Sequence, residues 1–127
     1  MSGKFDSHAF YERLYKLGLD CNYLVRFMPK SDLLREYCTQ LIRSSSSVRA
    51  NYIEALEALS KKDFIHRLKI SRKETRESVH WLRFIHDTCN LDESKESMVN
   101  LISEGNEIKK ILSSSILKLE TKQLIGD

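Results

Sequence analysis

The sequence predicts an all-α protein that folds as an up-down-up-down, left-handed four-helix bundle. Apolar residues recur at alternating steps of three and four, which is the spacing of a helix face packed inside a bundle. Only one proline and four glycines occur in 127 residues, so we expect few turns and long helices. No segment alternates strictly between apolar and polar residues, as a half-buried strand does. We therefore expect a single domain over residues 1–127.

The four helices are expected at about residues 7–28, 32–59, 61–89 and 92–123. Asp6 or Ser7 can cap the first helix, and Pro29 ends it because the residue before a proline avoids the helical conformation. Ser31 is a plausible N-cap of the second helix. Ser60 opens a pattern that resembles a capping box, which starts the third helix after a very short connection.

Small and polar residues occupy the middle of the predicted helix seams. They are the serines at 44–47, Asn51, Ser71, Thr75, Ser78, Gly105 and Ser115. A ligand cavity lined by hydroxyls is one explanation. We favour close helix approach, with hydroxyls bonded to carbonyls one turn earlier. Asn51 is expected to be buried and to fix the helix register. Glu54 is expected to join it in a structural polar core, with Arg43 or Arg49 as its partner, at the middle of the bundle or at a subunit boundary.

Basic residues on the third predicted helix follow steps of four and three, so they form one row about 30 Å long. This basic stripe consists of Lys62, His66, Lys69, Lys73, Arg76, His80 and Arg83. Its candidate nucleic-acid-binding residues are Lys62, Lys69, Lys73, Arg76 and Arg83, because a row of cations can meet several phosphates. The alternative is a solvated face paired with acids such as Glu74 and Glu77, or with a neighbouring subunit. No aromatic residues alternate with the cations, so stacking on single-stranded bases is not expected.

No catalytic arrangement is recognisable, and we expect no enzyme activity. Bundles that hold two metals use two Glu-x-x-His motifs and two further glutamates. Glu77 and His80 form one such motif here, but the matching pair, Glu104 and Glu107, lacks the histidine. The ligand set is therefore too small for a metal site. No glycine-rich phosphate loop is present, and no serine lies on a nucleophile elbow.

Cysteine usage and hydropathy indicate a cytoplasmic protein without a cofactor. Cys21, Cys38 and Cys89 are odd in number and form no CxxC pair, so we expect buried, reduced thiols. The N-terminal residues lack the apolar segment of a secretion signal. No stretch approaches the roughly 18 apolar residues that would span a bilayer, and no membrane partner is expected.

Three sequence blocks between residues 40 and 85 carry a resemblance to a known family. The first block is Gln40, Arg43, Ser44, Ser47, Val48, Ala50, Asn51, Tyr52, Glu54 and Ala55. The second is Ser60, Asp63, Phe64, Ile65, Leu68 and Ile70, and the third is Lys73, Glu74, Arg76, Glu77, Trp81 and Leu82. With these blocks the chain resembles the bacterial four-helix bundle protein family, which includes proteins encoded in intervening sequences of large ribosomal RNA genes. Arg49 stands where relatives usually have glycine or proline.

The resemblance implies self-association, since family members look like homo-oligomers and often pentamers. The family also includes retroelement accessory variability proteins, which bind nucleic acid and a reverse transcriptase. Our hypothesis is a non-enzymatic oligomeric scaffold or binding module that takes RNA, DNA or a nucleic-acid enzyme on its basic stripe, without sequence specificity. The alternatives are a purely structural homo-oligomer and a metal-dependent enzyme in the bundle core. Candidates for the oligomer contact are Tyr11, Tyr15, Tyr23 and Phe27.

Overall fold

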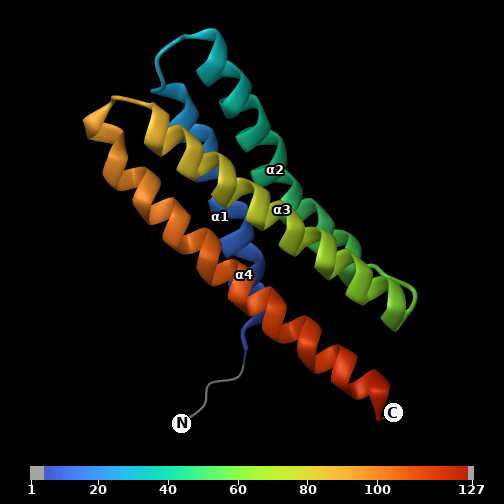
Figure 1. The fold of residues 1–127 in the computed structure, drawn as a ribbon. Helices are drawn as coiled ribbons and strands as arrows, with labels where there is room; N and C mark the ends of the chain where they lie inside the picture. The colour runs from blue at the N-terminus through green and yellow to red at the C-terminus, as the bar shows by residue number, and fades with distance from the viewer. Residues whose placement is uncertain (1–4, 126–127) are drawn as a thin grey trace.

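The computed structural model describes residues 5–125. Over this range it contains the helices α1 (Ser7–Arg26), α2 (Asp32–Leu56), α3 (Lys61–Thr88) and α4 (Lys95–Leu124), with a 3-10 turn, η1 (Asp92–Ser94), before α4. Each helix packs on its sequence neighbour, and α4 also returns to α1 (Figure 1). The expected all-α, up-down arrangement of four helices is confirmed.

Side-chain caps start the first three helices where the sequence predicts them. Oxygens of Asp6, Ser31 and Ser60 accept hydrogen bonds from amides two or three residues later, at 3.0 to 3.2 Å. These bonds satisfy amides that have no partner inside the helix. α1 ends at Arg26, earlier than predicted, because the amide of Phe27 bonds to the carbonyl three residues back and tightens the last turn.

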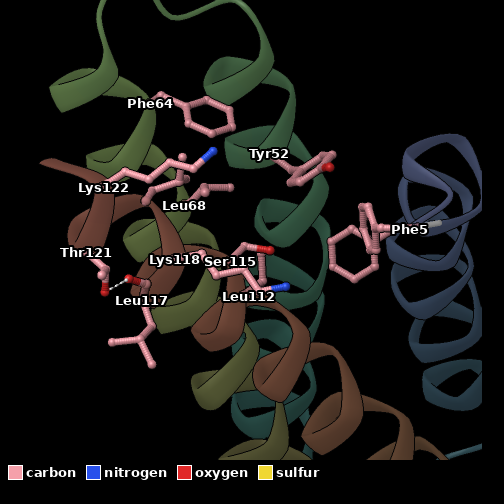
Figure 2. A pocket seen from close by; sticks show the side chains of 12 residues that line it. Phe5, Tyr52, Phe64, Leu68, Leu112, Ser115, Leu117, Lys118, Thr121 and Lys122 are labelled. Carbon is pink, nitrogen blue, oxygen red and sulfur yellow. Dashed lines mark hydrogen bonds between the residues drawn. The ribbon is translucent and has the colours of Figure 1, made fainter. Parts of the chain in front are cut away.

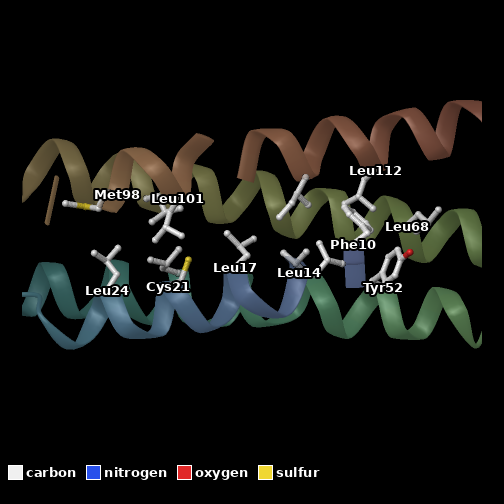
Figure 3. Close-up of a cluster of buried hydrophobic side chains, with 14 of the residues drawn as sticks. Phe10, Leu14, Leu17, Cys21, Leu24, Tyr52, Leu68, Met98, Leu101 and Leu112 are labelled. Carbon is white, nitrogen blue, oxygen red and sulfur yellow. The ribbon is translucent and has the colours of Figure 1, made fainter. Parts of the chain in front are cut away.

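A continuous apolar core runs along the bundle axis. Leu24 and Met98 lie at one end, next to the α1–α2 and α3–α4 connections (Figure 3). At the other end, the rings of Phe10 and Tyr52 meet edge to face, with centroids 5.3 Å apart, beside Leu68. Each fully buried leucine contributes about 1.5–3 kcal/mol to the free energy of unfolding.

The polar seam joins α2 to α3 at close range. Ser71 donates a hydrogen bond from its hydroxyl to the carbonyl oxygen of Val48 on α2, at 2.7 Å. The hydroxyls of Ser78 and Ser44 lie 3.0 Å apart across the same contact. Thr75 donates back to the carbonyl of Ser71 at 2.8 Å. Because these hydroxyls are buried and bonded, the seam brings the two helices together, as the sequence predicts.

The predicted polar core at Asn51 and Glu54 is wrong. The side chain of Glu54 is 57% exposed and lies 3.9 Å from Arg67. Asn51 is half-buried, and its amide donates to a carbonyl of its own helix rather than across the bundle. The buried face of α2 keeps a seven-residue spacing, and both Ser44 and Ser45 belong to it. Of the two positions seven residues further on, the packed helix buries Tyr52 and leaves Asn51 half-buried.

Arg49 is also engaged elsewhere than predicted. Its guanidinium lies over two tyrosine rings of α1, 4.0 Å from the centroid of Tyr11 and 4.7 Å from that of Tyr15. Such cation–π contacts contribute about 0.5–2 kcal/mol each. Arg49 therefore ties α2 to α1 instead of forming a polar cluster with Glu54.

Candidate nucleic-acid interface

The basic stripe lies on the outer surface of α3. All seven of its side chains are exposed. On the opposite side of the same helix, Leu68, Thr75 and Leu82 are buried in the core. Packing of that buried side fixes the rotation of α3, so the cations are held on the solvent side along the whole helix.

Two acids in the middle of α3 pair with an arginine of α2. Arg43 Nη1 lies 3.3 Å from a carboxylate oxygen of Glu74, and Nη2 of the same guanidinium donates to Glu77. The hydrogen bond to Glu74 is the main reason that the pKa of Arg43 is raised above its ordinary value. Because Arg43 already compensates both carboxylates, the expected alternative, in which Glu74 and Glu77 neutralise the stripe, is wrong for these acids.

One stripe residue is neutralised by α4. Lys69 Nζ lies 2.7 Å from a carboxylate oxygen of Glu120. The remaining lysines and arginines of the stripe make no ion pair within residues 5–125: Lys62, Lys73, Arg76 and Arg83. Four of the five predicted binding residues therefore lie at the surface without an ion pair in the described range, and of these Arg83 lies close enough to Asp87 for their charges to interact.

A hollow of about 440 Å³ opens beside the C-terminal half of the stripe. Arg76 and Arg83 line it from α3, and Lys109 adds a cation from α4 that sequence reasoning missed. The one carboxylate in the lining is Asp87, whose Oδ1 lies 2.9 Å from His86 Nδ1. This hydrogen bond, followed by the charges of His86 and Arg83, lowers the pKa of Asp87. The hollow has three cations against one acid that is already partnered.

A cluster of aromatic rings adjoins the hollow through Phe84, although no aromatic residues alternate with the cations in the sequence. Phe84 lines it, and the ring of Tyr37 on α2 lies parallel to Phe84, with centroids 4.9 Å apart and planes 13° apart. Trp81 is near-parallel to both rings, at 16° to Phe84 and 22° to Tyr37. We call these three residues the aromatic platform. The sequence signal was Trp81 and Phe84 flanking Arg83, but only the fold brings Tyr37 to them.

The candidate metal ligands are not brought together. Glu77 binds Arg43, whereas Glu104 accepts two hydrogen bonds from Arg13 of α1, at 2.7 and 3.0 Å. The imidazole of His80 stands edge-on to the aromatic platform. Within the described part of the chain, no three histidine, cysteine, aspartate or glutamate side chains are close enough to hold a metal ion.

An apolar groove of about 600 Å³ lies at the other end of the bundle, where α1 begins (Figure 2). α1 has 20 residues and α4 has 30, so α4 extends about 15 Å further at 1.5 Å per residue. The groove opens in the space that α1 leaves uncovered. Phe10, Tyr52, Phe64 and Leu68 form its floor, while Lys122 is also in its lining. It is remote from the basic hollow at the far end of α3.

The three cysteines are buried and unpaired, as expected. No helix within residues 5–125 combines the length and the apolar character needed to cross a membrane.

Comparison with known proteins agrees with this fold. Residues 7–114 match the family of the 23S rRNA-intervening sequence protein. No curated protein matches the chain. Among solved structures, a protein of unknown function from the S23 ribosomal protein family of Bacteroides thetaiotaomicron is 28% identical, with a TM-score of 0.72. The match covers 84% of this chain and 97% of that one. The chain therefore belongs to the 23S rRNA-intervening sequence protein family.

Proposed function

We propose that the chain is a non-enzymatic binding module that holds nucleic acid on the basic stripe of α3, without sequence specificity. The observation that carries this proposal is the set of four exposed stripe cations without an ion pair in residues 5–125, while Glu74 and Glu77 of the same helix pair with Arg43. Uncompensated cations in a row release counterions when they meet phosphates, which drives sequence-independent binding. The three free thiols support a reducing, cytoplasmic setting.

Charge reversal tests this proposal. The triple substitution Lys73→Glu, Arg76→Glu and Arg83→Glu replaces attraction for phosphate by repulsion. We expect the affinity for RNA, measured by fluorescence anisotropy, to fall at least about a hundredfold. The control is Lys30→Glu, Arg35→Glu and Lys110→Glu, which changes net charge equally at exposed positions away from the stripe. We expect the control to bind within a few-fold of the wild type. Equal affinity of both triple variants would refute a role for the stripe.

A second proposal, self-association, is supported by an apolar row on α1. Exposed apolar side chains recur there every four residues and wind around the outer side of the helix, since each step of four turns by about 40°. They are Tyr15, Leu19, Tyr23 and Phe27. Contiguous exposed apolar surface of this kind marks contacts between proteins. We propose that copies of the chain meet through this row as a homo-oligomer, with the pentamer common in the family as one candidate size.

Sedimentation velocity tests the oligomer. The double substitution Leu19→Lys and Tyr23→Lys places charge in the row, and we expect it to yield monomers while circular dichroism shows an unchanged helix content. The matched control is Leu33→Lys with Val99→Lys, at exposed apolar positions outside α1. If the wild type sediments as a monomer, the row is not an oligomer contact.

A further inference from the structure

The aromatic platform lies directly beside the free cations of the stripe. Arg83 and Phe84 are neighbours on α3, and both line the same hollow as Arg76. Phe84 keeps 40% of its surface exposed although it packs against Tyr37. The ring thus presents apolar surface in a hollow that three cations also line. Its position therefore suggests a ligand with both negative charge and flat apolar rings.

We propose that this site binds single-stranded nucleic acid, with an unpaired base stacked on the aromatic platform and flanking phosphates on Arg76, Arg83 and Lys109. The inference rests on the proposed nucleic-acid function and adds the class of strand. Aromatic side chains stack on the π-face of any base, so the site needs no particular sequence. Paired bases are stacked inside a duplex, so their faces cannot reach the platform.

The orientation of the rings supports stacking. Tyr37, Trp81 and Phe84 come from two helices, yet their planes agree within 22°. Tyr37 lies against Phe84 and Trp81 and holds them in this orientation, so little entropy is lost when a base arrives. His80 meets the rings at a steep angle and is itself exposed in the lining of the hollow.

Charge around the platform also favours a polyanion over a protein helix. Arg76, Arg83 and Lys109 face the hollow, against the single carboxylate of Asp87. Asp87 is close to His86, and Arg83 further offsets its charge. A second copy of the chain is the competing occupant, and its presence would show as a change in sedimentation.

The test compares an oligoadenylate with an abasic strand of the same length, which carries the phosphates but no bases. We expect wild type to bind the oligoadenylate at least about fivefold more tightly, from the stacking of one base. Trp81 is the only tryptophan of the chain, so its fluorescence should be quenched by the oligoadenylate and not by the abasic strand. A duplex of equal length should bind through its phosphates without quenching Trp81, because its bases are stacked on one another.

Phe84→Leu removes the ring but keeps apolar volume, so the fold should persist. We expect this variant to lose the preference for the base-bearing strand, whereas Phe27→Leu, at a 71% exposed phenylalanine just after α1, should retain it. If wild type binds both strands equally, base stacking on the platform is refuted, while phosphate binding by the basic stripe is not. If neither strand binds, the proposed function fails with it. A change of sedimentation in Phe84→Leu, with the base preference intact, would instead assign the platform to a contact between copies.

Discussion

Arg43 and Glu74 form the contact that separates the acidic residues of α3 from its basic stripe. Nη1 of Arg43 lies 3.3 Å from both carboxylate oxygens, although only Oε2 receives a well-directed hydrogen bond. Glu74 is the one charged residue that is buried in the described part of the chain. The pair therefore fixes the α2–α3 contact and keeps this acid away from the cations.

Removal of Arg43 should destabilise the bundle. Arg43→Ala leaves the carboxylate of Glu74, only 12% exposed, without its cation, and we expect a loss of about 1–3 kcal/mol in the free energy of unfolding. Adding Glu74→Gln should recover part of this loss, because a neutral amide is cheaper to bury. Arg35→Ala, at a 73% exposed side chain, should cost less than about 0.5 kcal/mol in the same urea titration. Similar losses for both arginines would contradict this assignment.

Gly105 allows α4 to approach α3. A Cβ at this position would lie 2.6 Å from Cγ2 of Val79, and a β-branched side chain moves with difficulty. Gly105→Ala should therefore lower the free energy of unfolding by up to about 2 kcal/mol, although alanine is the better helix former. In a Val79→Ala background the clash is absent, and the same substitution should stabilise by up to about 1 kcal/mol. Thermal unfolding midpoints measure this change of sign in the effect of Gly105→Ala. A lower midpoint for Gly105→Ala in both backgrounds would contradict the prediction.

Burial of Cys21 should make stability depend on alkaline pH. Burial, only partly offset by a hydrogen bond with Ser45, raises the pKa of the Cys21 thiol from 9.0 to about 12. The unfolded chain releases the thiol proton at a lower pH than the folded chain does. The contribution of Cys21 to the free energy of unfolding is therefore intact below pH 9 and is lost as pH rises towards 12. The difference in unfolding free energy between wild type and Cys21→Ala should shrink by up to about 1.4 kcal/mol per pH unit in this window. If this difference in unfolding free energy does not change with pH, the raised pKa of Cys21 is refuted.

The start of each of the first three helices could be predicted because its determinants are local. Asp6, Ser31 and Ser60 cap helices through amides two or three residues away, so sequence spacing contains the information. The close α2–α3 contact was likewise predictable, since runs of small residues on two facing helices leave little volume between them.

The positions of the misplaced residues depend on how the helices rotate and pack against one another. Asn51 was misplaced because Ser44 and Ser45 are both buried on α2, so the seven-residue spacing could continue to Asn51 or to Tyr52, and the packed helix buries Tyr52. Arg43 had several acids within its reach, and only the packing of α2 on α3 selects Glu74 and Glu77. The aromatic platform could not be predicted because Tyr37 lies far from Phe84 in sequence.

Salt dependence of RNA binding tests the central claim most directly. Four uncompensated cations on the stripe predict that the logarithm of the affinity falls with the logarithm of salt concentration at a slope of about −3 for a single strand. Neutralising Lys73, Arg76 and Arg83 to glutamine should bring that slope to about −1. A wild-type slope near zero, or one that is the same in the triple variant, would contradict nucleic-acid binding by this face of α3.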